Sequence, residues 1–233
     1  MRYIYPGKNV DLTMLKKFLS YFIPVNIVKK QSDISHNLEV TYNNGQLVLD
    51  SKNTNYSYGS LQRILRKGLK YIGFERIKGF NSILVLGVAG GSVIKTLVDE
   101  IGYKGNITGV EIDPKVIDIA NTYFKLSEIK NLEIVICDAF EFVLKSKNKY
   151  DLIIIDIFKD AVMPNFLFED FFINHVNAML NVNGFILFNT MTLTQEHKDR
   201  NILYRAHFND DYSVRMYPKV EDHNELYTIK KLK

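Results

Sequence analysis

Four apolar runs of this chain each lead into a glycine turn or an acidic residue, the residue types that bind nucleotides in α/β proteins. The run Ile83 to Leu86 precedes Gly87-Val88-Ala89-Gly90-Gly91, and Glu111 lies twenty residues after Gly91. Two later runs end at Asp138 and Asp156. Glycine lets a backbone approach a ligand closely, and an acid at that distance from the turn can accept both hydroxyls of a ribose. The spacing predicts a nucleotide-binding strand–helix–strand unit.

These groups are expected to meet at one edge of a sheet, because ligands bind outside the carboxyl ends of neighbouring parallel strands. Glu111 would hold the ribose and Asp138 the adenine amine, while Asp156 would face the reacting end. The backbone N–H of Ala139 would donate to a ring nitrogen. Such an electronegative rim favours a sulfonium ligand or an amine. The cofactor-binding residues are predicted to be Gly87, Ala89, Gly90, Gly91, Glu111, Asp138 and Ala139.

Three alternatives remain open on these residues alone. Any tight strand-to-helix turn can use glycine, and an acid at a strand end can simply cap the next helix. A dinucleotide oxidoreductase is the third, but Gly87, Ala89 and Gly91 form a G-x-A-x-G pattern without the later helix glycine of a dinucleotide site. The turn resembles that of S-adenosylmethionine-dependent transferases.

The elements that must position these groups alternate between strand and helix patterns. Apolar residues at helical spacing and capping residues such as Asp113-Pro114 mark the helices, and short apolar runs mark the strands. The alternation predicts a doubly wound α/β sheet with an antiparallel end. Helices are expected near 61–72, 92–101, 114–124, 139–144, 167–180 and 195–208, and strands near 83–86, 107–112, 132–137, 151–156, 185–189, 213–217 and 225–229.

A smaller piece precedes this unit. Leucines and a phenylalanine recur at helical spacing between Leu12 and Phe22, and Pro24 closes that segment. Residues 38–42 and 46–50 alternate around Asn44-Gly45, a dipeptide suited to a type I′ hairpin turn. We therefore expect a helix and β-hairpin extension over 1–75 and a nucleotide-binding domain over 76–233.

Composition describes an ordinary globular protein. Apolar residues make up 46% and charged residues 24% of the 233, and the net charge is a modest +4 with the basic residues scattered along the chain. This argues against a nucleic-acid partner. A single cysteine, Cys137, fits a reducing compartment, and no run is long enough to span a membrane, so a cytoplasmic location is expected. The five histidines lack the spacing of metal ligands, so no metal is expected.

From about Leu38 to Asn189 the chain resembles the spermidine synthase (aminopropyltransferase) family, which has the class I methyltransferase (Rossmann-like) fold. The matching motifs are Leu47-Val48-Leu49-Asp50, Tyr56-Ser57-Tyr58, Val110-Glu111-Ile112-Asp113-Pro114, Cys137-Asp138-Ala139 and the run Tyr150 to Asp156. The resemblance implies transfer of an aminopropyl group from decarboxylated S-adenosylmethionine to an amine such as putrescine. It also implies an N-terminal piece used in oligomer contacts, and hence a homodimer. Asp156 would be catalytic, and Tyr58 and Asp160 would bind substrate, although Tyr58 could instead pack on the sheet and Asp160 could be a solvated loop acid.

Several positions depart from the family pattern. The acid that grips the donor amine is replaced by Gly90, a Gln–Glu pair by Gly59-Ser60, and the acids after the fourth strand, Asp156 and Asp160, have three residues between them instead of two. An acid at position 90 would repel the carboxylate of intact S-adenosylmethionine, so Gly90 makes methyl transfer to a small nucleophile plausible. The alternative is a non-catalytic nucleotide-binding or interaction protein on a degenerate scaffold.

Overall fold

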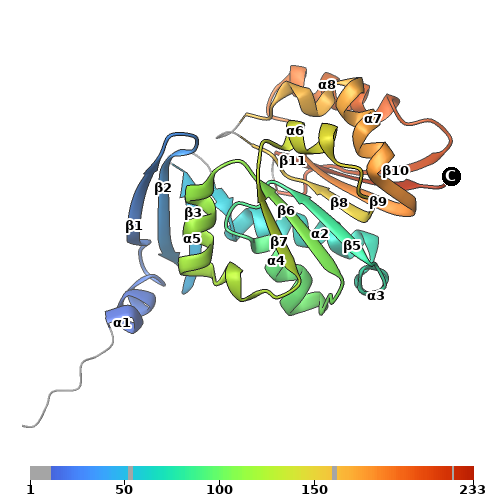
Figure 1. Cartoon of the computed structure of the whole chain (residues 1–233). Helices are drawn as coiled ribbons and strands as arrows, with labels where there is room; N and C mark the ends of the chain where they lie inside the picture. The colour runs from blue at the N-terminus through green and yellow to red at the C-terminus, as the bar shows by residue number, and fades with distance from the viewer. Residues whose placement is uncertain (1–11, 52–54, 159–161, 222) are drawn as a thin grey trace, which may run out of the picture.

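The computed structural model describes residues 12–51, 55–158, 162–221 and 223–233. Within these residues the chain forms a seven-stranded sheet and a separate four-stranded sheet (Figure 1). The order in the larger sheet is β10-β11-β9-β8-β5-β6-β7. Its strands are β5 (Ser82–Leu86), β6 (Asn106–Glu111), β7 (Leu132–Ile136), β8 (Tyr150–Ile155), β9 (Leu180–Met191), β10 (Tyr212–Tyr217) and β11 (Asn224–Lys231).

The larger sheet is parallel from β7 to β9, and β11 runs antiparallel to both of its neighbours. The predicted doubly wound sheet with an antiparallel end is therefore confirmed. The chain leaves β5 toward β6 on one side and reaches β8 on the other, so the strand order reverses at β5. The glycine turn and the three acids follow the carboxyl ends of the strands on both sides of this switch point, where open α/β sheets bind ligands.

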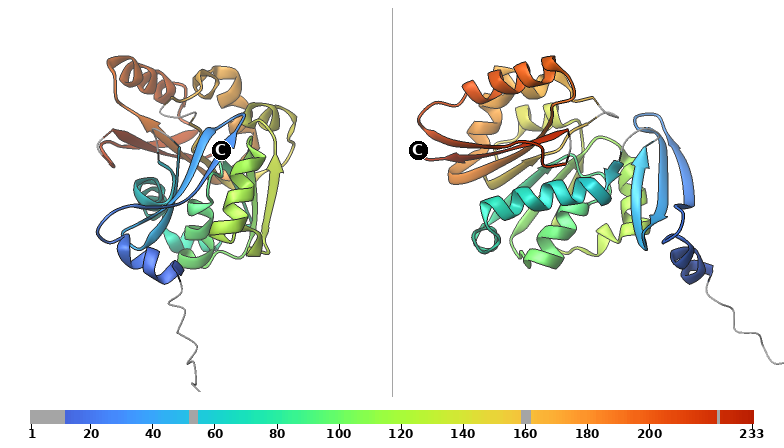
Figure 2. Two further views of the ribbon diagram at one scale, coloured as in Figure 1. Left: turned by 90° about the vertical axis from the view of Figure 1, so that its left-hand side faces the viewer. Right: turned by 180° about the vertical axis from the view of Figure 1, so that it is seen from behind.

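Helices cover both faces of the larger sheet (Figures 1 and 2). Alternate strand residues point to opposite faces, so Ile83 and Val85 join one core cluster and Leu84 and Leu86 the other. The first cluster is closed by α2 (Gly59–Ile72), α3 (Phe74–Lys78), α4 (Ser92–Lys95), η1 (Thr96–Ile101) and α5 (Pro114–Phe124), with η2 (Leu126–Glu128) beside it. The second is closed by α6 (Ala139–Lys145), η3 (Asn165–Phe168), α7 (Asp170–Met179) and α8 (Gln195–Ala206).

Two helical segments differ from the sequence expectation. The single helix expected over 167–180 is divided into η3 and α7, because Glu169 is extended, with φ −79° and ψ 136°. The helix after the glycine turn changes from α4 into the π-helix η1, and it ends at Gly102 with φ 76°, as the glycine there predicts.

The N-terminal sheet is larger than the predicted hairpin. Asn44 and Gly45 have φ values of 48° and 76°, which confirms the hairpin turn. The sheet consists of β1 (Val25–Ser32), β2 (His36–Asn43), β3 (Gln46–Ser51) and β4 (Asn55–Ser57). Two edge strands were not predicted, β1 and the short β4; in β1, lysines and a bulge near Asn26 obscure strict alternation.

This sheet packs beside α5 at one end of the molecule (Figures 1 and 2). Leu38, Val40 and Leu49 are fully buried there against α5. The helix α1 (Leu12–Leu19) precedes this sheet in the chain. Ser20, the residue after α1, anchors it to the hairpin turn, because its Oγ accepts from the amide of Gly45 at 2.9 Å. Every helix of the described residues is too short or too polar to cross a bilayer. The domain limits 1–75 and 76–233 stay a prediction.

Candidate active site

The glycine turn is tightly enclosed. Gly87 has φ 89°, and a Cβ atom there would lie 2.2 Å from the backbone oxygen of Asp156. Ala89 and Gly91 also have positive φ values, 48° and 80°. Backbone overlap cannot be relieved by rotating a side chain, so position 87 requires glycine. The turn that the sequence indicated therefore has a backbone path specific to small residues.

Glu111, at the end of β6, lies under this turn. Its Oε2 accepts hydrogen bonds from the amides of Val88 at 3.2 Å and Ala89 at 3.0 Å, and its Oε1 accepts from the amide of Asp113 at 3.1 Å. Burial raises the pKa of Glu111, while the amide hydrogen bonds act in the opposite direction. Glu111 thus fixes the turn, and a ribose hydroxyl would have to share oxygens that already accept amides. The ribose role stays a prediction.

Asp138, after β7, caps the next helix. Its Oδ1 accepts from the amide of Phe140 at 2.7 Å and from that of Glu141 at 3.4 Å. Ala139 is the first residue of α6. The capping alternative is therefore realised at Asp138, but it does not exclude an adenine contact, which stays a prediction together with that of Ala139.

Asp156, directly after β8, has a different environment. Asn189 Nδ2 donates to its Oδ1 at 2.9 Å. Burial raises the pKa of Asp156 to about 6, and the hydrogen bond from Asn189 only partly opposes this. A carboxyl group that titrates near neutral pH at a strand tip suits proton transfer. The structure brings its backbone against the glycine turn, and its reacting-end role stays a prediction.

Ser57 is a site residue that the sequence analysis did not single out. A Cβ atom on Gly90 would lie 2.8 Å from Ser57 Cβ and 3.3 Å from Tyr58 Cε2, so β4 closes the space beside Gly90. Ser57 Oγ also accepts from the amide of Ser92 at 3.2 Å. Position 90 therefore has no room for a carboxylate in this conformation.

Tyr58 borders two environments. Its edge lies near position 90, but its ring stacks on Phe124 with centroids 4.5 Å apart. Burial raises the pKa of its hydroxyl, and Asp99 adds to the effect. Tyr58 also lines a cavity of about 520 Å³ with Lys17 and Tyr42, and none of the three strand-end acids lines it. The packing role is thus realised, and a substrate contact stays a prediction. Asp160 lies outside the described residues.

Asp113 joins the two sheets, which the sequence analysis did not anticipate beyond its capping of α5. Its Oδ1 accepts from the amide of Lys115 at 2.9 Å, and its Oδ2 accepts from the hydroxyl of Ser32 and the amide of Ser35. Burial acts to raise the pKa of Asp113, but these hydrogen bonds outweigh it and hold the pKa below its usual value. Partners so distant in sequence leave no local signal.

The lone cysteine and the possible metal ligands are the remaining candidates from the sequence. Cys137 is half-buried, and its thiol donates to the backbone oxygen of Asp138 at 3.3 Å. Within the described ranges, no group of three or more histidine, cysteine or acidic side chains could hold a metal ion.

Comparison with known proteins shows what the chain is similar to. The model of the spermine/spermidine synthase domain matches residues 62–217. A polyamine aminopropyltransferase of Vibrio vulnificus is 28% identical over 137 residues, which are 58% of this chain and 46% of that protein. An eEF1A lysine and N-terminal methyltransferase homolog of Drosophila melanogaster is 28% identical over 116 residues, 46% of this chain and 17% of that protein. The chain spans less than half of the length of these two curated relatives.

A solved structure supports the fold. The spermidine synthase from Thermotoga maritima superposes with a TM-score of 0.67 at 20% identity, over 90% of this chain and 73% of that one. At this identity the likeness concerns the fold alone, which is the predicted Rossmann-like fold.

Proposed function

The chain belongs to the spermine/spermidine synthase family, and we propose that it is a group transferase of this kind that uses intact S-adenosylmethionine. The group that it transfers to an amine would then be methyl. The observation that carries this choice of donor is the packing of Gly90 against Ser57. An acid at that position would favour a donor without a carboxylate. Here the residue is glycine, and Ser57 leaves no room for an acidic side chain. The aminopropyl reaction remains the second candidate, because the Vibrio vulnificus relative is a polyamine aminopropyltransferase.

Residues of this chain supply the positions and charges that the reaction needs. The glycine turn, fixed by Glu111, would hold the nucleoside part of the donor, and Asp138 would reach the adenine. The sulfonium is an activated leaving group, so the protein mainly has to align donor and acceptor. An aliphatic amine is mostly protonated at neutral pH and must lose a proton before it attacks. Asp156 is suited to orient the ammonium form and accept that proton.

The step balances without a further reactant. The lone pair of the amine nitrogen forms a bond to the methyl carbon, and the carbon–sulfur bond breaks with its electron pair passing to sulfur. The products are the methylated amine and S-adenosylhomocysteine, and one proton leaves the nitrogen. The names of the relatives support nitrogen as the acceptor atom, since they include a polyamine transferase and a lysine and N-terminal methyltransferase. A homodimer and a cytoplasmic location remain proposals.

A product assay separates the candidates. The protein is incubated with S-adenosylmethionine or its decarboxylated form, and with small polyamines or peptides carrying a free N-terminal or lysine amine. We expect S-adenosylhomocysteine from the intact donor. Methylthioadenosine from the decarboxylated donor would support aminopropyl transfer instead. Calorimetric binding of NAD but not of S-adenosylmethionine would contradict both.

A second experiment tests the donor choice itself. Gly90→Asp alone would collide with Ser57, so it is combined with Ser57→Gly, and Ser57→Gly alone is the control. We expect the double variant to bind intact S-adenosylmethionine about tenfold more weakly than the control, because two carboxylates repel each other. Unchanged affinity would remove Gly90 as the determinant of the donor.

A further inference from the structure

Two asparagine side chains connect Asp156 to the far edge of the sheet. Asn189, on β9, has no exposed surface, and its Nδ2 donates to Asp156 Oδ1 at 2.9 Å. Its Oδ1 accepts from Asn224 Nδ2, at the start of β11, at 3.0 Å. The carboxylate, Asn189 and Asn224 thus form one hydrogen-bonded row across two strands.

The direction of these hydrogen bonds depends on the charge of the acid. An ionised carboxylate only accepts, so it requires the NH₂ group of Asn189 to face it, and the carbonyl oxygen of Asn189 then meets the NH₂ group of Asn224. A protonated Asp156 that donated to Asn189 would turn that amide around. Two NH₂ groups would then face each other unless Asn224 also turned. The row therefore orients Asp156 and gives its ionised form a hydrogen-bond donor.

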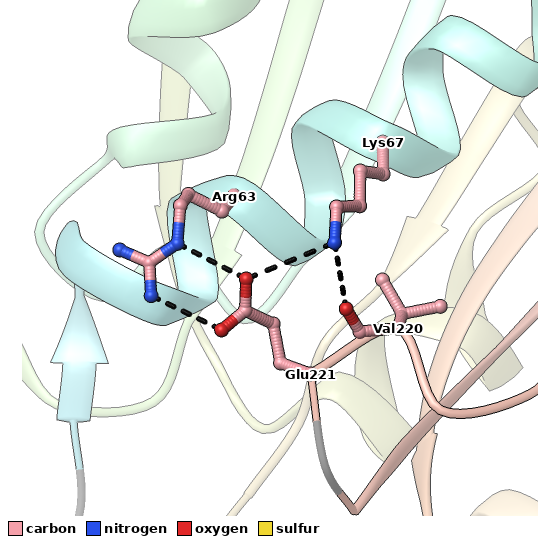
Figure 3. A network of polar contacts seen from close by, with 4 residues as sticks. All are labelled: Arg63, Lys67, Val220 and Glu221. Carbon is pink, nitrogen blue, oxygen red and sulfur yellow. Dashed lines mark hydrogen bonds and ion pairs between the residues drawn. The ribbon is translucent and has the colours of Figure 1, made fainter.

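The outer end of the row is fixed to another element. The turn before β11 is closed by hydrogen bonds from the amide of Asn224 to the oxygen of Glu221 at 2.9 Å and from the amide of Val220 to the oxygen of Asn224 at 3.0 Å. Figure 3 shows how this turn is held on α2. Arg63 forms two hydrogen bonds to the Glu221 carboxylate, at 3.0 and 3.1 Å, and Lys67 Nζ donates to the backbone oxygen of Val220 at 2.7 Å. Exposed ion pairs add little stability, but here they locate the turn that carries Asn224.

We propose that Asn189, oriented by Asn224, is the positioning residue for Asp156, and that the pair holds one carboxylate oxygen toward the sheet and leaves the other for the acceptor amine. This rests on the proposed function only for the identity of the acceptor. The backbone oxygen of Asp156 and the side chain of Ile157 both lie beside Gly87. Among the described residues, burial and the Asn189 amide determine the pKa of Asp156, and no charged side chain contributes to it.

The test measures the titration of Asp156 directly. Carboxyl carbon NMR of the full-length protein, with the signal assigned by Asp156→Asn, gives the midpoint in wild type, Asn189→Ala and Asn224→Ala. We expect Asn189→Ala to raise the midpoint by about one pH unit, because it removes a hydrogen bond to the charged form. Asn224→Ala should raise it by less, because the amide facing the acid stays in place. Asn148→Ala, at an exposed asparagine, should leave it unchanged.

Several outcomes decide whether the two asparagines position Asp156, which we call the relay, or only pack beside it. If Asn189→Ala does not fold, Asn224→Ala decides alone, because Asn224 is only half-buried at a strand end. A midpoint unchanged in every folded variant would overturn the relay. Where transfer is measurable, the acidic limb of kcat/KM should move upward with the midpoint. A shifted midpoint without transfer would keep the relay and refute the proposed reaction. Transfer with an unshifted midpoint would keep the proposed reaction and refute the relay.

Discussion

On the β6–β7 side of the rim, the acids are held by backbone amides, whereas on the β8–β9 side the acid is held by a side chain from a neighbouring strand. Glu111 accepts from the amides of the glycine turn and of Asp113, and Asp138 accepts from the first turn of α6. Asp156 accepts from Asn189, and burial raises its pKa to about 6. Acids of one rim thus differ in environment: backbone amides hold Glu111 and Asp138, whereas a side-chain amide holds Asp156 and burial raises its pKa.

The strongest test of this comparison is Asp156→Asn. If Asp156 orients the ammonium and removes its proton, transfer should fall about 100-fold or more. Donor affinity should stay within about threefold, because the donor is held on the other side of the rim. Transfer by the wild type should also decline below pH 6, as the carboxylate becomes protonated. Full turnover by the variant would remove Asp156 from the reaction, and Asp118→Asn, at an exposed acid of α5, is the matched control.

The same substitution should stabilise the protein. The pKa of Asp156 is raised from 3.8 to about 6 in the folded state, so the folded protein binds more protons than the unfolded chain between these values. Its contribution to stability is therefore present below about pH 4 and is lost as the pH rises through 6. At pH 7 we expect Asp156→Asn to raise the free energy of unfolding by about 1–2 kcal/mol, and at pH 4 to leave it unchanged. Urea denaturation at the two pH values measures this, and a destabilised variant at pH 7 would contradict the burial argument.

Sequence alone predicts the β6–β7 side of the rim better than the β8–β9 side, for a physical reason. The partners of Asp138 lie within three residues, and Glu111 binds a turn that its own spacing indicates. Asn189 and Asn224 lie 33 and 68 residues beyond Asp156. The parallel pairing of β8 with β9 places Asn189 beside Asp156, and the antiparallel pairing of β9 with β11 adds Asn224. The strands were predicted, but a side-chain row across them depends on register, which apolar patterning does not specify. Ser57 was missed for the same reason, since its contact with the glycine turn depends on how the N-terminal sheet packs, which the local sequence does not indicate.

Glu111→Gln tests whether backbone donors make that acid structural. Both carboxylate oxygens accept amides, so either orientation of a glutamine would place its NH₂ group against backbone N–H donors. We expect the distorted turn to bind S-adenosylmethionine about tenfold more weakly, close to 1.4 kcal/mol. Calorimetry measures the affinity, with Glu128→Gln as the exposed control. Equal binding by the two variants would contradict both the turn-fixing role and the expected ribose contact.

The smallest effect is expected at Asp138, where helix capping and an adenine contact can be separated. Asparagine caps helices about as well as aspartate, so Asp138→Asn should change the free energy of unfolding by less than about 0.5 kcal/mol, whereas Asp138→Ala should lower it by about 1 kcal/mol. Both capping hydrogen bonds reach Oδ1, so an asparagine must keep its carbonyl oxygen toward the α6 amides. Its NH₂ group would then face the adenine amine, and two donors repel. We therefore expect Asp138→Asn to bind the donor about threefold more weakly while its stability is kept. Unchanged affinity in this variant would show that Asp138 only caps α6, and the β6–β7 side of the rim would then contact the donor through Glu111 and the glycine turn alone.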